Sequence, residues 1–148
     1  MSAPLPVSVT AGPVLLFDGE CGLCNRIVRG LLRLDRRGRL SYAPLQSAPA
    51  QLFLRQHGLP CEEFESLVFV PDWAHRERSD FLQRTDGAIA ALRVCGGVGR
   101  VLAAILSIVP RVVRDAGYRL IGRWRYRLFG PWRPRPLRRA EWAQRFLA

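Results

Sequence analysis

Two cysteines, three residues apart, are the side chains of this sequence best suited to chemistry. Cys21 and Cys24 lie in the stretch Asp-Gly-Glu-Cys-Gly-Leu-Cys, which spans residues 18–24. Two thiols at this spacing can close a small disulfide with little change of the backbone, and a thiolate is the attacking species in thiol–disulfide exchange. The spacing therefore indicates redox chemistry, with a metal site as the main alternative.

The flanking residues indicate what positions the two cysteines. Residues 14–17 are a continuous apolar run, which is typical of a short strand buried on both faces. A helical pattern follows over residues 25–36. Its apolar side chains recur on one face: Leu23, Ile27, Leu31 and Leu34. At a helix start, the unpaired N–H groups and the helix dipole favour a thiolate, so a strand-to-helix turn suits a reactive pair.

The next segments predict the remainder of an α/β sheet. Strands are expected at residues 40–43, 67–70 and 80–84, a helix between Ser47 and Gly58, a polar turn at 72–79, and a helix capped by residues 85–87. A parallel pair followed by an antiparallel hairpin gives a four-stranded mixed sheet with flanking helices.

The C-terminal part has a different character. Residues 98–109 predict a very apolar helix that Pro110 ends, and residues 112–129 predict a long helix with an arginine belt. A last short helix is expected at 140–147, with Trp142 and Phe146 docking back on the core. The chain thus divides into a flexible lead-in at 1–13, a core at 14–95 and an arginine-rich helical extension at 96–148.

The charge lies almost entirely in that extension. The chain has 148 residues and a net charge of +11, but residues 1–92 hold ten arginines and ten acids, whereas residues 93–148 hold thirteen arginines and two acids. Three interpretations stay open: a solvated helix face whose arginine stems cover apolar surface, an amphipathic helix on an anionic membrane surface, or non-specific contact with nucleic acid. No motif for specific nucleic-acid binding is present.

Composition and segment lengths set the expected location. No apolar run reaches the 18 residues of a spanning helix, and residues 1–13 carry no basic residue and no long apolar run, unlike a signal peptide. We therefore expect a cytoplasmic protein, in which a close cysteine pair serves redox chemistry or metal binding more often than structure.

The predicted element order is the thioredoxin-like arrangement, with the cysteine pair where the first strand meets the first helix. More narrowly, the chain resembles the DCC family of thiol-disulfide oxidoreductases, named after its aspartate and two cysteines. Three stretches carry the resemblance, which covers roughly residues 14–130: residues 16–25 (LFDGECGLCN), 42–47 (YAPLQS) and 125–130 (RYRLFG).

The resemblance implies a redox-active centre with Cys21 as nucleophile and Cys24 as resolving thiol. In such a pair the first sulfur is usually the more exposed. Asp18, the third signature residue, either accepts a proton from Cys24 or holds the turn by bonding backbone N–H groups. A protein or small-molecule disulfide is the implied substrate, and glutathione or a reductase the implied reductant; no cofactor is expected. Residues 61–67 lack the proline that thioredoxins place before their third strand.

Two other classes of function remain. One is a non-catalytic module whose cysteine pair is structural or binds zinc, for which Cys61, Cys95, His57 and His75 are the other soft ligands. These four are predicted instead to be an incidental thiol, a core cysteine and two surface histidines, so no metal is expected. The other class is an adaptor that acts on a membrane or nucleic acid through the basic extension.

Overall fold

The structure, a computed structural model, describes residues 12–35, 38–59, 61, 67–75, 81–129 and 146. Its elements are β1 (Val14–Phe17), α2 (Gly22–Leu34), β2 (Ser41–Pro44), α3 (Ala48–Gln56), β3 (Val68–Val70), a 3-10 turn η1 (Trp73–His75), β4 (Leu82–Gln83), α4 (Arg84–Cys95), α5 (Val98–Ile108) and α6 (Arg111–Phe129). The predicted order of strands and helices is confirmed up to residue 129.

Strand β1 is the centre of the molecule. The sheet has the order β2-β1-β3-β4; β1 pairs with β2 in parallel and with β3 antiparallel, and β3 and β4 form the antiparallel hairpin. Leu15 lies between Tyr42 of β2 and Phe69 of β3. All four residues of β1 are buried, as the continuous apolar run predicted. The mixed four-stranded α/β fold is thioredoxin-like.

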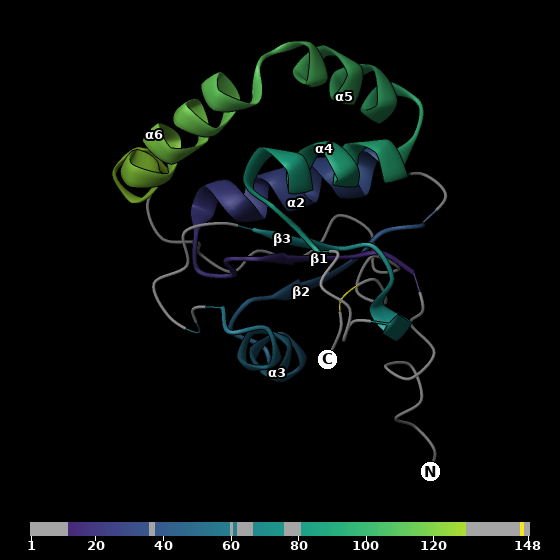
Figure 1. Ribbon diagram of the computed structural model, residues 1–148, viewed down its shortest axis with the longest axis vertical. Coiled ribbons are helices and arrows are strands. Elements are labelled where there is room, and N and C mark those ends of the chain that lie inside the picture. Colours follow the sequence, from purple (N-terminus) through teal and green to yellow (C-terminus); the bar gives the residue numbers. More distant parts are fainter. Residues whose placement is uncertain are drawn as a thin grey trace.

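Helices cover both faces of this sheet (Figure 1). Helices α2 and α4 lie on one face and α3 on the other, while α5 and α6 form an outer layer beyond α4 and α2. The two faces hold separate cores. The first packs Leu15 and Phe17 against α2 and α4, and the second packs Val14 and Leu16 against α3 and Trp73. Burial on both faces fixes β1, and with it the residues that follow.

The boundary between β4 and α4 differs from the prediction. The expected strand over 80–84 is β4, and α4 already begins at Arg84, whose φ is +53°. Thr85 was expected to cap this helix, but its hydroxyl donates to Asp115 Oδ1 at 2.6 Å. The Thr85 side chain therefore contacts α6 and does not cap α4. The local sequence could not predict this, because α6 lies about 30 residues away in the chain.

The buried face of α2 also differs. Leu31 is buried as predicted, together with Val28 and Leu32, but Leu23 is only partly buried and Ile27 is 42% exposed. Val28 and Leu32, each one residue further along the chain than an expected position, face the sheet. Leu23 and Ile27 lie on the adjacent side of the helix and face α6.

The C-terminal prediction is tested at one residue. Phe146 forms a parallel bridge with Tyr42 at the outer edge of β2, so it is extended there and not helical. Its ring packs on those of Phe17 and Tyr42, which confirms that it docks on the core. The rest of the expected last helix, Trp142 included, and residues 1–11 of the lead-in lie outside the described residues. None of the described helices is long and apolar enough to cross a membrane.

Candidate functional site

The turn between β1 and α2 is built on a buried aspartate. Asp18 follows the last residue of β1 and is 4% exposed. Its Oδ1 accepts a hydrogen bond from the Glu20 N–H at 3.0 Å, and its carbonyl accepts one from the Cys21 N–H at 3.2 Å. An aspartate that bonds the backbone two residues on stabilises a tight turn. Asp18 therefore stabilises the turn that places Cys21 at the start of α2.

A glutamine from the neighbouring strand braces this turn. Parallel strands end at the same edge of a sheet, so the residues after β2 lie beside those after β1. Gln46 Nε2 donates to Asp18 Oδ1 at 2.8 Å, and Gln46 Oε1 accepts from the Gly19 N–H at 3.0 Å. A Cβ on Gly19 would lie 3.0 Å from the Pro44 Cβ, so the close approach favours glycine. Gln46 thereby holds both the Asp18 side chain and the Gly19 backbone against the end of β2.

Asn25 ties the turn to the helix. Its Nδ2 donates to the Gly19 carbonyl at 3.0 Å and to the Cys21 carbonyl at 2.9 Å. Asn25 and Gln46 thus bond the carbonyl and the N–H of Gly19, two backbone groups that the regular helix and strand pairing do not satisfy. Sequence reasoning gave neither residue a role, although both belong to the stretches that carry the family resemblance.

The two cysteines lie in the first turn of α2. Cys21 is the N-cap residue, with an extended backbone, and Cys24 is the third helical residue. Their exposure is the reverse of the expectation: Cys21 is 0% exposed, whereas Cys24 is partly buried and borders a pocket. The expectation that Cys21 is the more exposed is therefore wrong in this structure. Spacing alone cannot give exposure, because the segments that cover a helix start come from elsewhere in the chain.

The pocket beside Cys24 has a volume of about 360 Å³ and an apolar wall. Helix α6 closes it on one side, and β1, α2 and Leu67, immediately before β3, form the rest. Its lining is Leu15, Phe17, Leu23, Cys24, Ile27, Val28, Leu67, Tyr118, Ile121 and Gly122. Such a pocket can hold an apolar group next to a sulfur atom. The partial exposure of Leu23 and Ile27 follows from this arrangement, because both face the pocket.

Tyr118 links α6 to the strand beside the cysteines. Its hydroxyl accepts a hydrogen bond from the Leu67 N–H at 3.1 Å, immediately before β3. Both residues also line the pocket. Helix α6 therefore contributes directly to the surroundings of Cys24, a role that the sequence did not reveal for any residue of this helix.

Ionic and polar contacts with α4 fix the first turns of α6. Asp86 pairs with Arg111 and, at 3.5 Å, with Arg114. The hydrogen bond from Thr85 lowers the pKa of Asp115, and the nearby guanidinium of Arg111 adds to this shift. These contacts hold the start of α6 against α4.

The other candidate ligands lie apart from this turn. Cys95 is buried in the core and its thiol donates to the Leu31 carbonyl at 3.7 Å, which confirms the predicted core cysteine. Cys61 is partly buried against the α3 side. His75 is exposed as predicted, but His57 is partly buried, with its ring 4.3 Å from that of Phe53, because aromatic side chains cover it. Within the described ranges, no three His, Cys, Asp or Glu side chains gather as metal ligands would.

Comparisons with known proteins show which sequences this chain is similar to. The family described as DCC1-like thiol-disulfide oxidoreductase matches residues 15–131. The uncharacterized protein YuxK of Bacillus subtilis is 36% identical over 110 residues, covering 74% of this chain and 75% of YuxK. A chloroplastic DCC family protein of Arabidopsis thaliana is 29% identical over 106 residues, covering 72% of this chain and 58% of that protein. No solved structure matches significantly.

Proposed function

Because the chain belongs to the DCC1-like thiol-disulfide oxidoreductase family, we propose that it exchanges disulfides through Cys21 and Cys24. The observation that carries this proposal is the position of the pair. Both cysteines lie in the first turn of α2, directly after the central strand β1. Helix-start N–H groups and the helix dipole stabilise a thiolate there.

The proposed reaction transfers two electrons to a substrate disulfide. The Cys21 thiolate attacks one substrate sulfur, which breaks the substrate S–S bond and releases the other sulfur as a thiolate. The Cys24 thiolate then attacks the Cys21 sulfur of the mixed disulfide and releases the second substrate thiol. The Cys21–Cys24 disulfide that remains is reduced by glutathione or a reductase. We assign the attacking role to Cys21 because it lies at the N-cap of α2 and because the family resemblance implies it.

The apolar pocket beside Cys24 supports a substrate with an apolar group near its disulfide. Apart from the reactive Cys24, the lining side chains are aliphatic or aromatic, so a charged substrate group there would lose its hydration without gaining a partner. A protein or peptide disulfide flanked by a large apolar side chain fits this wall best. Since Cys21 is covered in the resting structure, such a substrate must displace neighbouring chain before exchange begins.

Asp18 acts in this proposal as a positioning residue. Its Oδ1 is shared by two donors, Glu20 N–H and Gln46 Nε2, and these bonds account for its burial. They favour the turn-holding role over direct proton transfer from Cys24. The cytoplasmic location expected from the sequence remains a prediction.

A turnover assay tests the proposed function. The purified chain should accelerate the reduction of a self-quenched fluorescent peptide disulfide by glutathione, and Cys21→Ser and Cys24→Ser should each lose that acceleration. Cys61→Ser is the matched control, because Cys61 is another partly buried thiol that lies outside the turn. Equal turnover by Cys21→Ser and wild type, or stoichiometric zinc whose removal unfolds the protein, would contradict the proposal.

A further inference from the structure

Helix α5 is packed with its amphipathic pattern reversed. In a helix on the surface of a globular protein, the apolar stripe normally faces the core. Here the residues that face inward are small, Gly99 and Ala103, and both are buried. The large apolar residues face outward at the spacing i, i+3, i+4, i+7: Val98, Val101, Leu102 and Ile105.

Close contact with α4 explains this orientation. A Cβ on Gly99 would clash with the Leu92 carbonyl oxygen, so only glycine allows α5 to approach α4 this closely. The hydrogen bond from Arg93 to the Ser107 hydroxyl, at 3.2 Å, further ties α4 to α5. The large residues are consequently directed away from the core; Val101 is 59% exposed and Ile105 is 55% exposed.

Helix α6 continues the same apolar surface and adds arginine to it. Val112, Val113, Leu120 and Trp124 are all exposed. Arg119, Arg123 and Arg127 are exposed among them, and the Arg127 guanidinium lies 5.0 Å from the centre of the Trp124 ring. Of the fourteen exposed large apolar residues in the described part of the chain, eleven belong to α5 and α6. Patches of this kind mark interaction sites.

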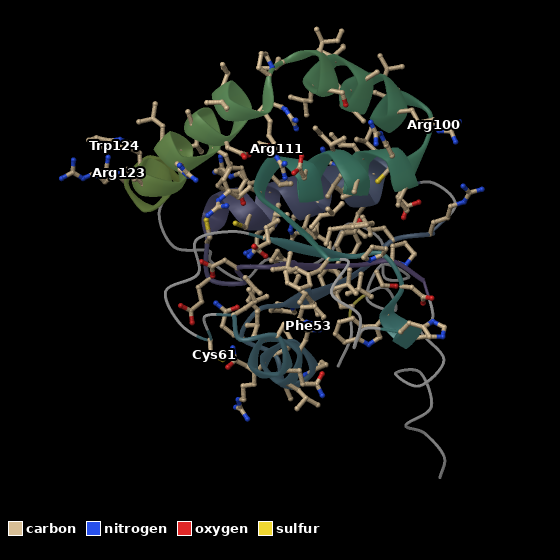
Figure 2. All side chains as sticks on the ribbon, in the orientation of Figure 1. Phe53, Cys61, Arg100, Arg111, Arg123 and Trp124 are labelled. Atoms are coloured by element: carbon tan, nitrogen blue, oxygen red, sulfur yellow. The ribbon has the colours of Figure 1, made fainter. Side chains whose placement is uncertain are left out.

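Positive charge lies at both ends of this two-helix layer. Figure 2 shows Arg100 at one end and Arg123, with Trp124, at the other. Beside Arg100, a cavity of about 580 Å³ is also lined by Arg33 and Arg39. The only acid in residues 98–129 is Asp115, which is bonded inward to Thr85. The exposed face of the layer therefore combines aliphatic side chains with arginine and tryptophan and carries no exposed acid.

We propose that the outer face of α5 and α6 binds the surface of an anionic lipid membrane. Aliphatic side chains that enter the boundary between headgroups and acyl chains, with arginine among the anionic headgroups and tryptophan between them, are the pattern of an in-plane membrane helix. The positive charge of this face favours an anionic membrane over a second copy of this chain, because a dimer formed through this face would bring the same arginines together.

Vesicle sedimentation with the full chain tests this proposal. Wild type should bind vesicles of phosphatidylcholine mixed with phosphatidylglycerol and should bind pure phosphatidylcholine much less. Val101→Ser with Ile105→Ser should lower the partition coefficient by about tenfold or more, because apolar burial is lost. Leu52→Ser is the matched control: Leu52 is 51% exposed but lies on α3, across the sheet (Figure 1). This variant should bind like wild type.

A second pair of variants isolates the electrostatic part. Arg119→Gln with Arg123→Gln should weaken binding by roughly 10- to 30-fold at low salt, since each arginine near the surface contributes about 1 kcal/mol. Arg55→Gln on α3 is its control and should bind like wild type. Cys21→Ser should also bind vesicles like wild type, so failure of the redox proposal would leave this one standing.

Three results would overturn the membrane proposal. The first is wild type that does not sediment with either kind of vesicle. The second is sedimentation that the Val101→Ser, Ile105→Ser variant retains in full. The third is a concentration-dependent dimer, or a complex with duplex DNA, that those same substitutions disrupt while vesicles remain unbound.

Discussion

A buried aspartate stabilises the chain at each end of α2, but the two ends have different roles. At its N-terminal end, Asp18 accepts hydrogen bonds from the Glu20 N–H and Gln46 Nε2. At its C-terminal end, Asp35 is 1% exposed and accepts from the Arg39 and Leu40 N–H groups, at 3.1 and 2.8 Å. Both aspartates hold the chain at a helix end, but only the N-terminal turn carries a cysteine pair and borders an apolar pocket; the cavity at the C-terminal end is lined in part by arginines.

The contrast shows how an aspartate that stabilises a turn can also support a reactive site. The Asp35 carboxylate bonds the chain that leads into β2, so it connects two consecutive elements. Asp18 also bonds a side chain that follows β2, and through Gln46 it fixes the backbone of Gly19. The N-terminal turn is thus held by residues distant in sequence, as exchange between two thiols in fixed positions requires.

The largest expected effect comes from stopping the reaction at the N-terminal end. Cys24→Ser removes the thiol that resolves the mixed disulfide, so turnover should fall by more than about 100-fold. A peptide disulfide substrate should accumulate as a mixed disulfide on Cys21, identified by mass spectrometry after proteolysis. Cys21→Ser should form no such adduct on Cys24. An adduct that forms on Cys24 in Cys21→Ser, and not on Cys21 in Cys24→Ser, would reverse the two roles.

The next largest effect is expected at the C-terminal end and concerns stability alone. Asp35→Ala leaves the partly buried Arg39 N–H and the buried Leu40 N–H without their acceptor, so the free energy of unfolding should fall by about 2–4 kcal/mol. Urea denaturation measures this change. Turnover per folded molecule should equal that of wild type at temperatures where the variant is folded. A large loss of turnover in fully folded Asp35→Ala would remove the distinction between the two ends of α2.

Substitutions at Asp18 should affect both stability and turnover. Asp18→Ala removes the acceptor of Glu20 N–H and Gln46 Nε2, so unfolding should become easier by about 1–3 kcal/mol and exchange slower by about tenfold. Asp18→Asn keeps an oxygen at Oδ1 and should retain most of the exchange rate. Its pH–rate profile should match that of wild type. A profile that loses one ionisation in Asp18→Asn would instead assign proton transfer to this carboxylate.

The smallest effect is expected where α6 meets α4, and it depends on pH. The pKa of Asp115 is lowered, chiefly by the Thr85 hydrogen bond, so its ionised form stabilises the folded state. That contribution is complete above the unfolded pKa of about 4 and is lost as pH falls through the lower folded value. Asp115→Asn should therefore be less stable than wild type at neutral pH, and the difference should shrink below about pH 4. A difference that persists unchanged into acid would exclude this ionisation as its cause.

The turn and the element order could be predicted because their signals are local. A continuous apolar run, an Asp-Gly turn and two cysteines at helix-start spacing follow one another within residues 14–24. Each of these patterns depends on neighbouring residues, and the structure retains all of them. Gln46 and Asn25 escaped prediction because their bonds depend on the parallel pairing of β1 and β2 and on side-chain direction.

The outer helices show what local patterns leave undetermined. The sequence predicted a very apolar helix over residues 98–109, but which of its side chains face outward depends on the close contact at Gly99. The exposure of Cys21 and the pocket beside Cys24 are likewise set by segments far apart in sequence, including Tyr118 of α6. Apart from Phe146, which is extended where a helix was expected, the sequence failed to predict the orientation of these elements and not their type.

A redox titration tests the central claim most directly. The protein is equilibrated in glutathione buffers of graded potential, its thiols are alkylated, and the alkyl groups are counted by mass. We expect two thiols to oxidise together with a single midpoint, and this transition should be absent in Cys21→Ser and intact in Cys61→Ser. Thiols at positions 21 and 24 that never oxidise as a pair across the range, or that react only after a chelator is added, would contradict the account.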